Sequence, residues 1–174
     1  VYDRGLSSDD ISDLFSANSA PVQSAIEGTN VAYTENDPAI QITNAISISD
    51  VDDTTIESPV VAITGNFATG EDLLIFSDTG TITGVWNSTL GTLTLTGGDT
   101  LANYEAALRS ITYQNTSDTP SDLTRTVSFT VNDGDADSNV SKLVVTPRRV
   151  MIRPEIIKTT NMAALEIPRY RPKK

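Results

Sequence analysis

The segment TRTVSFTVNDGDAD, residues 124–137, decides the fold. Apolar and polar side chains alternate over residues 124–132, and a period of two predicts a β-strand. Three aspartates then crowd into residues 133–137, where a turn is expected. Two further acidic clusters, residues 35–37 and 50–53, also follow predicted strands. Carboxylates packed this closely repel one another unless water screens them or a hard cation binds them.

The same period of two runs through the body of the chain, and turn-forming Gly, Asn, Asp and Pro separate the runs. Short strands at this spacing predict an all-β sandwich. One short helix is also predicted over residues 101–108, with Thr100 as its N-cap and Leu101, Tyr104 and Leu108 on one face. The predicted strands are Val31–Thr34, Ile40–Thr43, Ala45–Ser49, Val60–Gly65, Asp72–Phe76, Ile82–Trp86, Thr92–Thr96, Ile111–Gln114, Thr124–Asn132 and Val140–Thr146.

The composition removes several classes of function. The chain has 174 residues with no cysteine and no histidine, so it has no disulfide, no thiol nucleophile and no imidazole for general-base catalysis or for zinc. Its net charge is −11. Residues 1–146 hold 21 acidic and 4 basic residues, whereas residues 147–174 hold 2 acidic and 8 basic residues. An acidic body repels phosphate, which argues against nucleic acid as a partner and favours cations.

We divide the chain into three parts. The sequence predicts a short strand, a helix and a linker over residues 1–20. It predicts the β-sandwich over residues 21–147 and a basic, proline-rich tail over residues 148–174. We expect the tail to be disordered, although it could instead fold back on the acidic body or be foreign to the module. No apolar run approaches the ~20 residues that span a bilayer, so no membrane insertion is expected. The chain does not begin with Met, so we expect it to be an excised piece, and the lack of a signal peptide is uninformative about secretion.

Seven segments follow one another in the body of the chain: YTENDP (33–38), ISDVD (48–52), ITGNF (63–67), ITG (82–84), LTLTG (93–97), YEAALRSITYQN (104–115) and RTVSFTVNDG (125–134). Through these segments, residues 20–147 resemble the cadherin-like repeats of large bacterial surface adhesins. The resemblance implies a Greek-key, cadherin/immunoglobulin-like β-sandwich that acts as an extracellular adhesion and spacer module. The segment VYDRGLSSDDI (1–11) makes residues 1–18 similar to the last strand and closing helix of laminin-G-like, concanavalin A-like lectin domains.

Calcium is the cofactor that the resemblance implies. Cadherin-type repeats bind calcium through a Glu near the first strand, an Asp-x-Asp and an Asp/Asn-rich boundary segment. By motif match these positions are Glu35, Asp50, Asp52 and Asp133. In an extended Asp-x-Asp both side chains point to the same side, so Asp50 and Asp52 can share one ion.

Asp135 and Asp137 have the same spacing and complete the candidate ligands. The alternative is that all these acids are ordinary turn residues. The linkers also depart from the family pattern, because Asn18-Ser19-Ala20-Pro21 replaces Asn-Asp-Ala-Pro and Pro147 is followed by two arginines. Both linkers therefore differ from the pattern on which the family's boundary sites depend.

Two other functions compete with calcium-dependent adhesion. Glu71 and Asp72 could form the carboxylate pair of a glycosidase, but solvated loop acids are the better reading, and we expect no catalysis. Trp86 and Tyr104 could stack on sugars in a carbohydrate-binding module, although core packing is favoured. We expect a monomer on the bacterial cell surface. Its partners would be neighbouring modules of the same chain and a cell-surface protein or glycan.

Overall fold

A computed structural model describes residues 5, 7, 8 and 18–150. Most of the strand and helix predicted for residues 1–20 lies outside the described residues, as does the predicted basic tail beyond Val150. In the described part no helix is long and apolar enough to cross a membrane.

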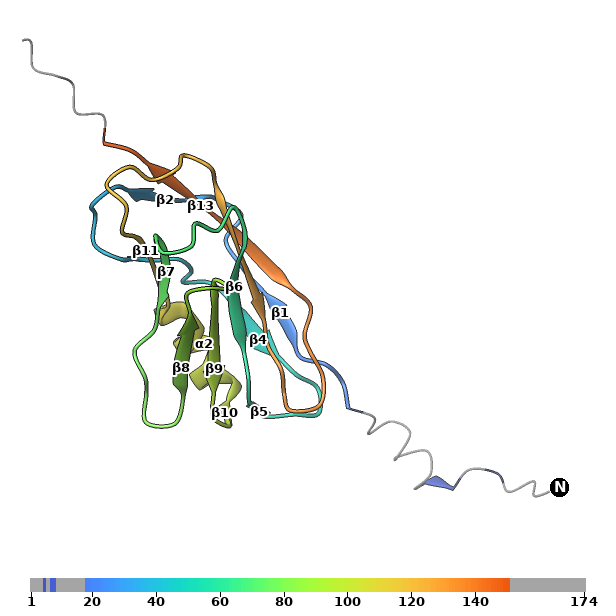
Figure 1. Ribbon diagram of the computed structural model, residues 1–174. Helices are drawn as coiled ribbons and strands as arrows, with labels where there is room; N and C mark the ends of the chain where they lie inside the picture. Colours follow the sequence, from blue (N-terminus) through green and yellow to red (C-terminus); the bar gives the residue numbers. More distant parts are fainter. Residues whose placement is uncertain (1–4, 6, 9–17, 151–174) are drawn as a thin grey trace, which may run out of the picture.

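The described chain is an all-β sandwich with one short helix (Figure 1), as the alternation predicts. A six-stranded sheet has the order β2-β13-β12-β6-β9-β8, and a three-stranded sheet has the order β3-β11-β7. Two ribbons, β1-β4 and β10-β5, complete the fold. The elements are β1 (Val22–Ser24), β2 (Val31–Thr34), β3 (Ile40–Gln41), β4 (Ser47–Ser49), β5 (Thr55–Ile56), β6 (Val60–Gly65), β7 (Asp72–Ile75), β8 (Thr83–Asn87), β9 (Thr92–Thr96), β10 (Asp99–Thr100), α2 (Leu101–Ser110), β11 (Thr112–Asn115), β12 (Arg125–Thr130) and β13 (Ser141–Arg148).

Among the described residues, strand pairing is antiparallel except between β2 and β13, which run parallel with Val31 opposite Val145 and Thr34 opposite Arg148. β12 and β13 are consecutive antiparallel neighbours, whereas β2 and β6, which flank them, come from much earlier in the chain. Such long-range neighbours are typical of sandwiches in which the chain crosses repeatedly between sheets.

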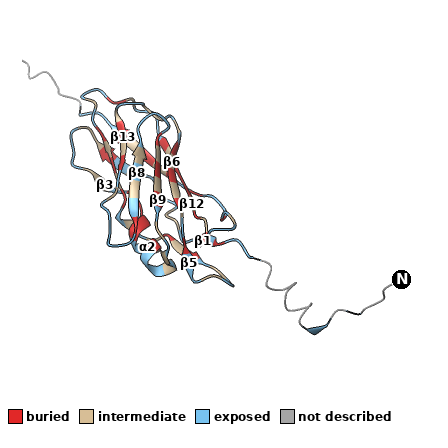
Figure 2. Cartoon of the chain, turned by 60° about the horizontal axis from the view of Figure 1, so that its bottom comes forward, coloured by how far each residue is buried: buried red, intermediate tan, exposed pale blue. Residues whose placement is uncertain are grey.

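Alternation places the core between the sheets (Figure 2). In β12, Val127 and Phe129 are completely buried, and in β13 Leu143 and Val145 face the same interior. Across that interior the rings of Tyr33 and Tyr113 meet edge to face with centroids 5.3 Å apart. Burial of these aliphatic and aromatic side chains supplies the main driving force of folding, in a chain without disulfides.

Helix α2 begins as predicted, because the Thr100 hydroxyl accepts a hydrogen bond from the N–H of Asn103 at 3.3 Å. Tyr104 and Leu108 are buried as expected, together with Ala107, while Leu101 is only partly buried. Polar contacts then fix the helix to β4 and to Ile46 just before it. The Glu105 carboxylate accepts from the N–H of Ile48 at 2.8 Å, and the Arg109 guanidinium donates to the carbonyl of Ile46 at 2.6 and 2.9 Å.

Some strand boundaries differ from the predictions. β1, β5 and β10, which have two or three residues each, were not predicted. β13 continues through Pro147 to Arg148, so residue 148, predicted to begin the tail, lies in the last strand opposite Thr34 of β2. Proline is tolerated here although it lacks an N–H to donate to the ladder.

Candidate metal centre

The loop after β4 is a tight turn and not the extended Asp-x-Asp that was predicted. The Asp50 Oδ1 atom accepts hydrogen bonds from the backbone N–H groups of Asp52 and Asp53, each at 3.2 Å. This is the local side-chain bonding that Asp favours in turns. Asp52 is not among the side chains whose carboxylate oxygens converge with that of Asp50, and its own carboxylate accepts from the N–H of Ser19 instead.

A second turn, between β12 and β13, presents Asp133. Its Oδ1 atom accepts from the N–H groups of Asp135 at 2.8 Å and Ala136 at 2.7 Å, and Gly134 supplies the positive φ of 113° that the turn needs. The carbonyl of Asn132 accepts from the N–H of Glu57 at 2.9 Å. That bond ties this turn to the segment just after β5, so the two acidic turns lie side by side.

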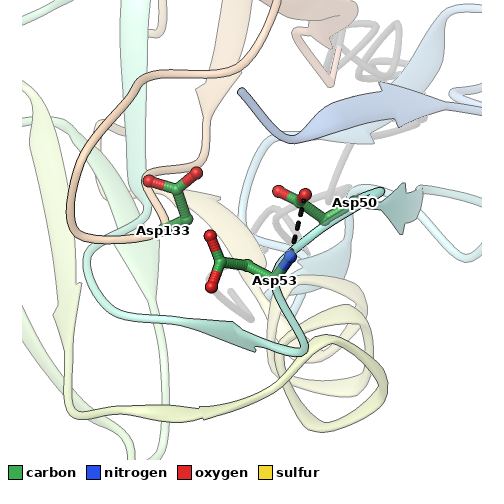
Figure 3. A group of neighbouring side chains, drawn as sticks. All are labelled: Asp50, Asp53 and Asp133. Carbon is green, nitrogen blue, oxygen red and sulfur yellow. Dashed lines mark hydrogen bonds between the residues drawn. The ribbon is translucent and has the colours of Figure 1, made fainter. Parts of the chain in front are cut away.

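Asp50, Asp53 and Asp133 converge between the two turns (Figure 3). Each offers one carboxylate oxygen, and these oxygens lie within 4.8 Å of one another. Asp133 is only 7% exposed. The Oδ2 atom of Asp50 is buried and has no hydrogen-bond partner among the described residues. A buried carboxylate oxygen without a donor is costly, and a cation between the three side chains would satisfy it.

The electrostatics of the cluster favour a cation. Desolvation, together with the negative charges of Asp52, Asp133, Asp50 and Asp135, raises the pKa of Asp53. Repulsion of this kind is what a divalent ion relieves.

Asp133 behaves differently from Asp53. Burial acts to raise the pKa of Asp133, but hydrogen bonds from the N–H groups of Ala136 and Asp135 and from the side chain of Asn18 outweigh it, and the pKa is lowered. Asp133 therefore stays ionised, as a ligand to a hard cation must be.

The linker ahead of β1 contacts the same turns. The N–H of Ser19 donates to both carboxylate oxygens of Asp52 at 3.0 and 3.2 Å. The side-chain amide of Asn18 donates to Asp133 Oδ2 at 3.3 Å. Asp52, predicted as an ion ligand beside Asp50, is thus exposed and anchors the linker.

The remaining predicted ligands do not join the cluster. Asp135 and Asp137 are exposed, and the carboxylate of Asp137 accepts from the side chain of Asn132 at 2.8 Å. Glu35 follows β2 at the far end of β13, where its carboxylate accepts from the N–H of Val150 at 2.9 Å. Eight strand residues separate that end from the acidic turns, roughly 23 Å. Glu35 therefore cannot share an ion with Asp50 or Asp133.

The sequence prediction left out Asp53. Asp53 belongs to the acidic run of residues 50–53. The prediction of an extended Asp-x-Asp, however, selected only every second residue as a candidate ligand. An aspartate at the start of such a run is equally typical of an Asx turn. In that turn its side chain accepts hydrogen bonds from backbone N–H groups two or three residues later, as Asp50 does here. Recognition of that turn would have selected Asp53.

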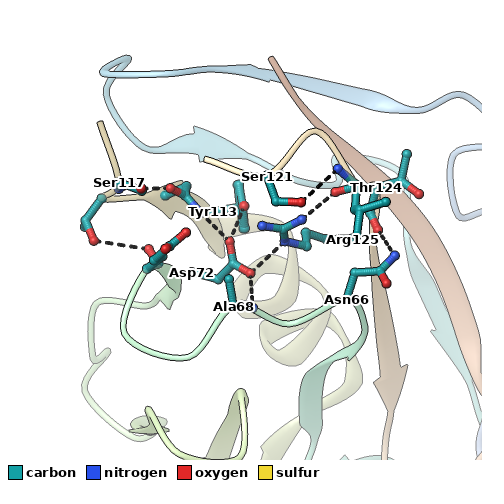
Figure 4. Close-up of polar contacts among 12 residues, drawn as sticks. Asn66, Ala68, Asp72, Tyr113, Ser117, Ser121, Thr124 and Arg125 are labelled. Atoms are coloured by element: carbon teal, nitrogen blue, oxygen red, sulfur yellow. Dashed lines mark hydrogen bonds and ion pairs between the residues drawn. The ribbon is translucent and has the colours of Figure 1, made fainter. Parts of the chain in front are cut away.

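For the pair Glu71 and Asp72 we expected solvated loop acids, and this expectation is wrong for Asp72. Asp72 is not a solvated loop acid, because it is 1% exposed and its Oδ2 atom lies 2.7 Å from the Nε of the fully buried Arg125 (Figure 4). The Oδ1 atom of Asp72 accepts from Tyr113 at 2.6 Å and Asn115 at 2.7 Å. All its lone pairs are engaged inside the sandwich, and no substrate can reach them.

The aromatic candidates pack into the protein, as favoured. Tyr104 is completely buried and donates its hydroxyl proton to the carbonyls of Glu57 and Gly97, so its ring cannot stack on a sugar. Trp86 is partly buried and packs against the core, with Phe67 edge to face at 6.2 Å.

Comparison with models of known protein families gave no match, and a search of curated proteins gave none either.

Proposed function

We propose that the chain is a calcium-stiffened adhesion and spacer module of a repetitive bacterial surface protein, acting outside the cell and without catalysis. The observation that carries this proposal is the meeting of Asp50, Asp53 and Asp133 around the buried, unpartnered oxygen of Asp50. The resemblance to cadherin-like repeats supports the same reading.

The donor set suits calcium. Calcium binds about 6–8 oxygen atoms, and three carboxylates supply a strong anionic core to which water adds the remaining ligands. The site contains no nitrogen or sulfur donor, so softer metals gain nothing from it. When bound, the ion would neutralise the repulsion that raises the pKa of Asp53 and would hold the two turns together.

The position of the cluster supports a spacer role. It lies at the end of the sandwich where the linker of residues 18–20 arrives, and Asn18 donates directly to the ligand Asp133. An ion that fixes Asp133 therefore also stiffens the connection to whatever precedes the module. The partners in this proposal are neighbouring modules of the same chain and a cell-surface protein or glycan, and the module itself is a monomer.

Thermal melting of the chain with calcium and with chelator tests the proposal. Extracellular calcium modules have Kd values of about 0.1–1 mM, so 10 mM calcium should raise the melting temperature by about 4–9 °C. The same concentration of magnesium should do much less, because magnesium gives up its water reluctantly.

The matched control is Asp118→Ala, which removes an exposed carboxylate in the loop before β12. Because Arg125 at the start of β12 pairs with Val145, this loop lies at the Val150 end of the sandwich, away from the acidic turns. This variant should keep the full calcium response. An unchanged melting temperature of the wild-type chain at 10 mM calcium would contradict the proposal.

A further inference from the structure

Strand β13 connects the two ends of the molecule. Residues 18–20 leave the sandwich at one end of its long axis and Val150 leaves at the opposite end (Figure 1). β13 runs between these ends, from Ser141 beside the acidic turn to Arg148 beside Val150. Tension applied at residues 18–20 and at Val150 would therefore act in a direction parallel to β13.

The parallel pair of β2 and β13 is oriented to resist such tension. Its four residue pairs run from Val31–Val145 to Thr34–Arg148. Pulling the start of one parallel strand against the end of the other slides the strands along each other and loads all their hydrogen bonds together. An antiparallel hairpin pulled from its two open ends instead loses its hydrogen bonds one after another.

Glu35 lengthens this parallel ladder at the C-terminal end. Its N–H donates to the carbonyl of Arg148 at 2.9 Å, and its carboxylate accepts from the N–H of Val150 at 2.9 Å. Arg149 adds a bond from its Nε to the carbonyl of Pro120 at 2.6 Å. The chain is thus held for two residues beyond the last strand.

Asn139 anchors the other end of β13, two residues before the strand begins. Its side chain pairs with the backbone of Gln23 in β1, accepting from the N–H at 2.7 Å and donating to the carbonyl at 3.0 Å. Gln23 is itself 3% exposed, and its side-chain amide donates to Ser138 at 2.6 Å and to the carbonyl of Phe129 at 3.1 Å. The first strand of the module is therefore fastened directly to the base of the last one.

We propose that β13, with the parallel ladder to β2 and the side-chain anchors of Glu35 and Asn139, is a force-bearing clamp. The clamp transmits tension from one end of the module to the other through a single strand that is held at both ends. Its use in the cell rests on the proposed spacer function, but its hydrogen bonds involve none of the three clustered carboxylates. The clamp consequently works with or without calcium.

Constant-force unfolding of the full chain, with handles at Val1 and Lys174 and chelator present, tests the clamp. Glu35→Ala and Asn139→Ala should each unfold about three- to tenfold faster than the wild-type chain, because each loses one or two loaded hydrogen bonds. Asp118→Ala should unfold at the wild-type rate. Moving the first handle to Ser88, at the exposed end of β8, should also give faster unfolding, because the sheet is then peeled from its edge.

Wild-type unfolding rates for both Glu35→Ala and Asn139→Ala under force would overturn the clamp. Equal resistance when the chain is pulled from Ser88 would also overturn it. The side chain of Asn139 is exposed and that of Glu35 is half-buried. Melting in the absence of force checks that both variants are folded. Failure of the calcium proposal appears separately, as an absent calcium response in melting, because the force measurement contains chelator.

Discussion

At the scale of single residues, Asp53 is the member of the acidic cluster that the fold stabilises least. Its carboxylate receives no hydrogen bond from the described residues, while its neighbours' charges and its desolvation raise its pKa. Because the pKa of Asp53 is higher in the folded state than in the unfolded state, protonation of Asp53 stabilises the fold. This stabilisation is complete below the unfolded pKa and is lost as the pH rises through the folded pKa. At neutral pH without calcium, Asp53 therefore opposes folding.

Replacement of this carboxylate should separate repulsion from ligation. In chelator, Asp53→Ala should melt at a higher temperature than the wild-type chain, because a repelled charge is gone. In 10 mM calcium the rise of about 4–9 °C expected for the wild type should disappear, because a ligand is gone. Differential scanning calorimetry in both buffers measures the two effects. A variant that melts lower in chelator and keeps its calcium response would exclude Asp53 from the site.

The buried tyrosines predict loss of stability in alkali. Burial, with the nearby charges of Asp99 and Glu57, raises the pKa of Tyr104 to about 12. Burial also raises the pKa of Tyr113. The stability that their protonated forms contribute is complete below the ordinary pKa of 10 and is lost as the pH rises through about 12.

Melting at intervals from pH 9 to about 12.5, with tyrosinate absorbance followed in parallel, tests this window. Tyr104→Phe should lower the free energy of unfolding at pH 8 by about 0.5–1.5 kcal/mol, because its hydrogen bonds are lost, and should weaken the alkaline dependence. Tyrosinate that forms near pH 10 before any unfolding would contradict the prediction.

At the scale of elements, the pair of Asp72 and Arg125 joins the two sheets. Asp72 begins β7 in the three-stranded sheet, and Arg125 begins β12 in the six-stranded sheet. Asp72 also accepts from the N–H of Ala68 at 2.7 Å, so it organises the turn before β7 as well. In a chain without cysteine this ion pair is a polar cross-link through the interior.

Removal of one partner leaves the other charge buried and unpaired. Asp72→Ala should therefore lower the free energy of unfolding by about 3–5 kcal/mol, as measured by urea denaturation. The neighbouring Glu71→Ala is the matched control and should change it by less than about 0.5 kcal/mol. Similar losses in the two variants would show that the buried pair does not join the sheets in an energetically important way.

The sequence predicts elements better than it predicts the site. Alternation located the long strands and the Thr100 cap located the helix, because both signals are local. The partner of Asp72 lies 53 residues away in the chain, and nothing local distinguishes a buried Asp at a strand start from a solvated one. The prediction named Asp52 and left out Asp53 for the same reason. The hydrogen bonds that Asp50 accepts from both residues shape the turn, and within that turn it is Asp53 whose carboxylate lies near Asp133.

At the scale of the whole molecule, the two ends of the sandwich differ in chemistry. The end that receives residues 18–20 gathers the carboxylates of the acidic turns, whereas the end at Val150 gathers Glu35, Arg148 and Arg149 in hydrogen bonds and an ion pair with Asp122. β13 links the two ends. In the proposed array, calcium stiffens the upstream junction and the strand ladder carries tension to the next module.

The central claim is that the two acidic turns hold a calcium ion, and a crystal structure of the chain grown in 10 mM calcium tests it most directly. We expect one ion within about 2.3–2.6 Å of carboxylate oxygens from Asp50, Asp53 and Asp133, with water completing the coordination and Glu35 still bonded to Val150. Three carboxylates around water alone, or calcium bound only elsewhere on the molecule, would contradict the account.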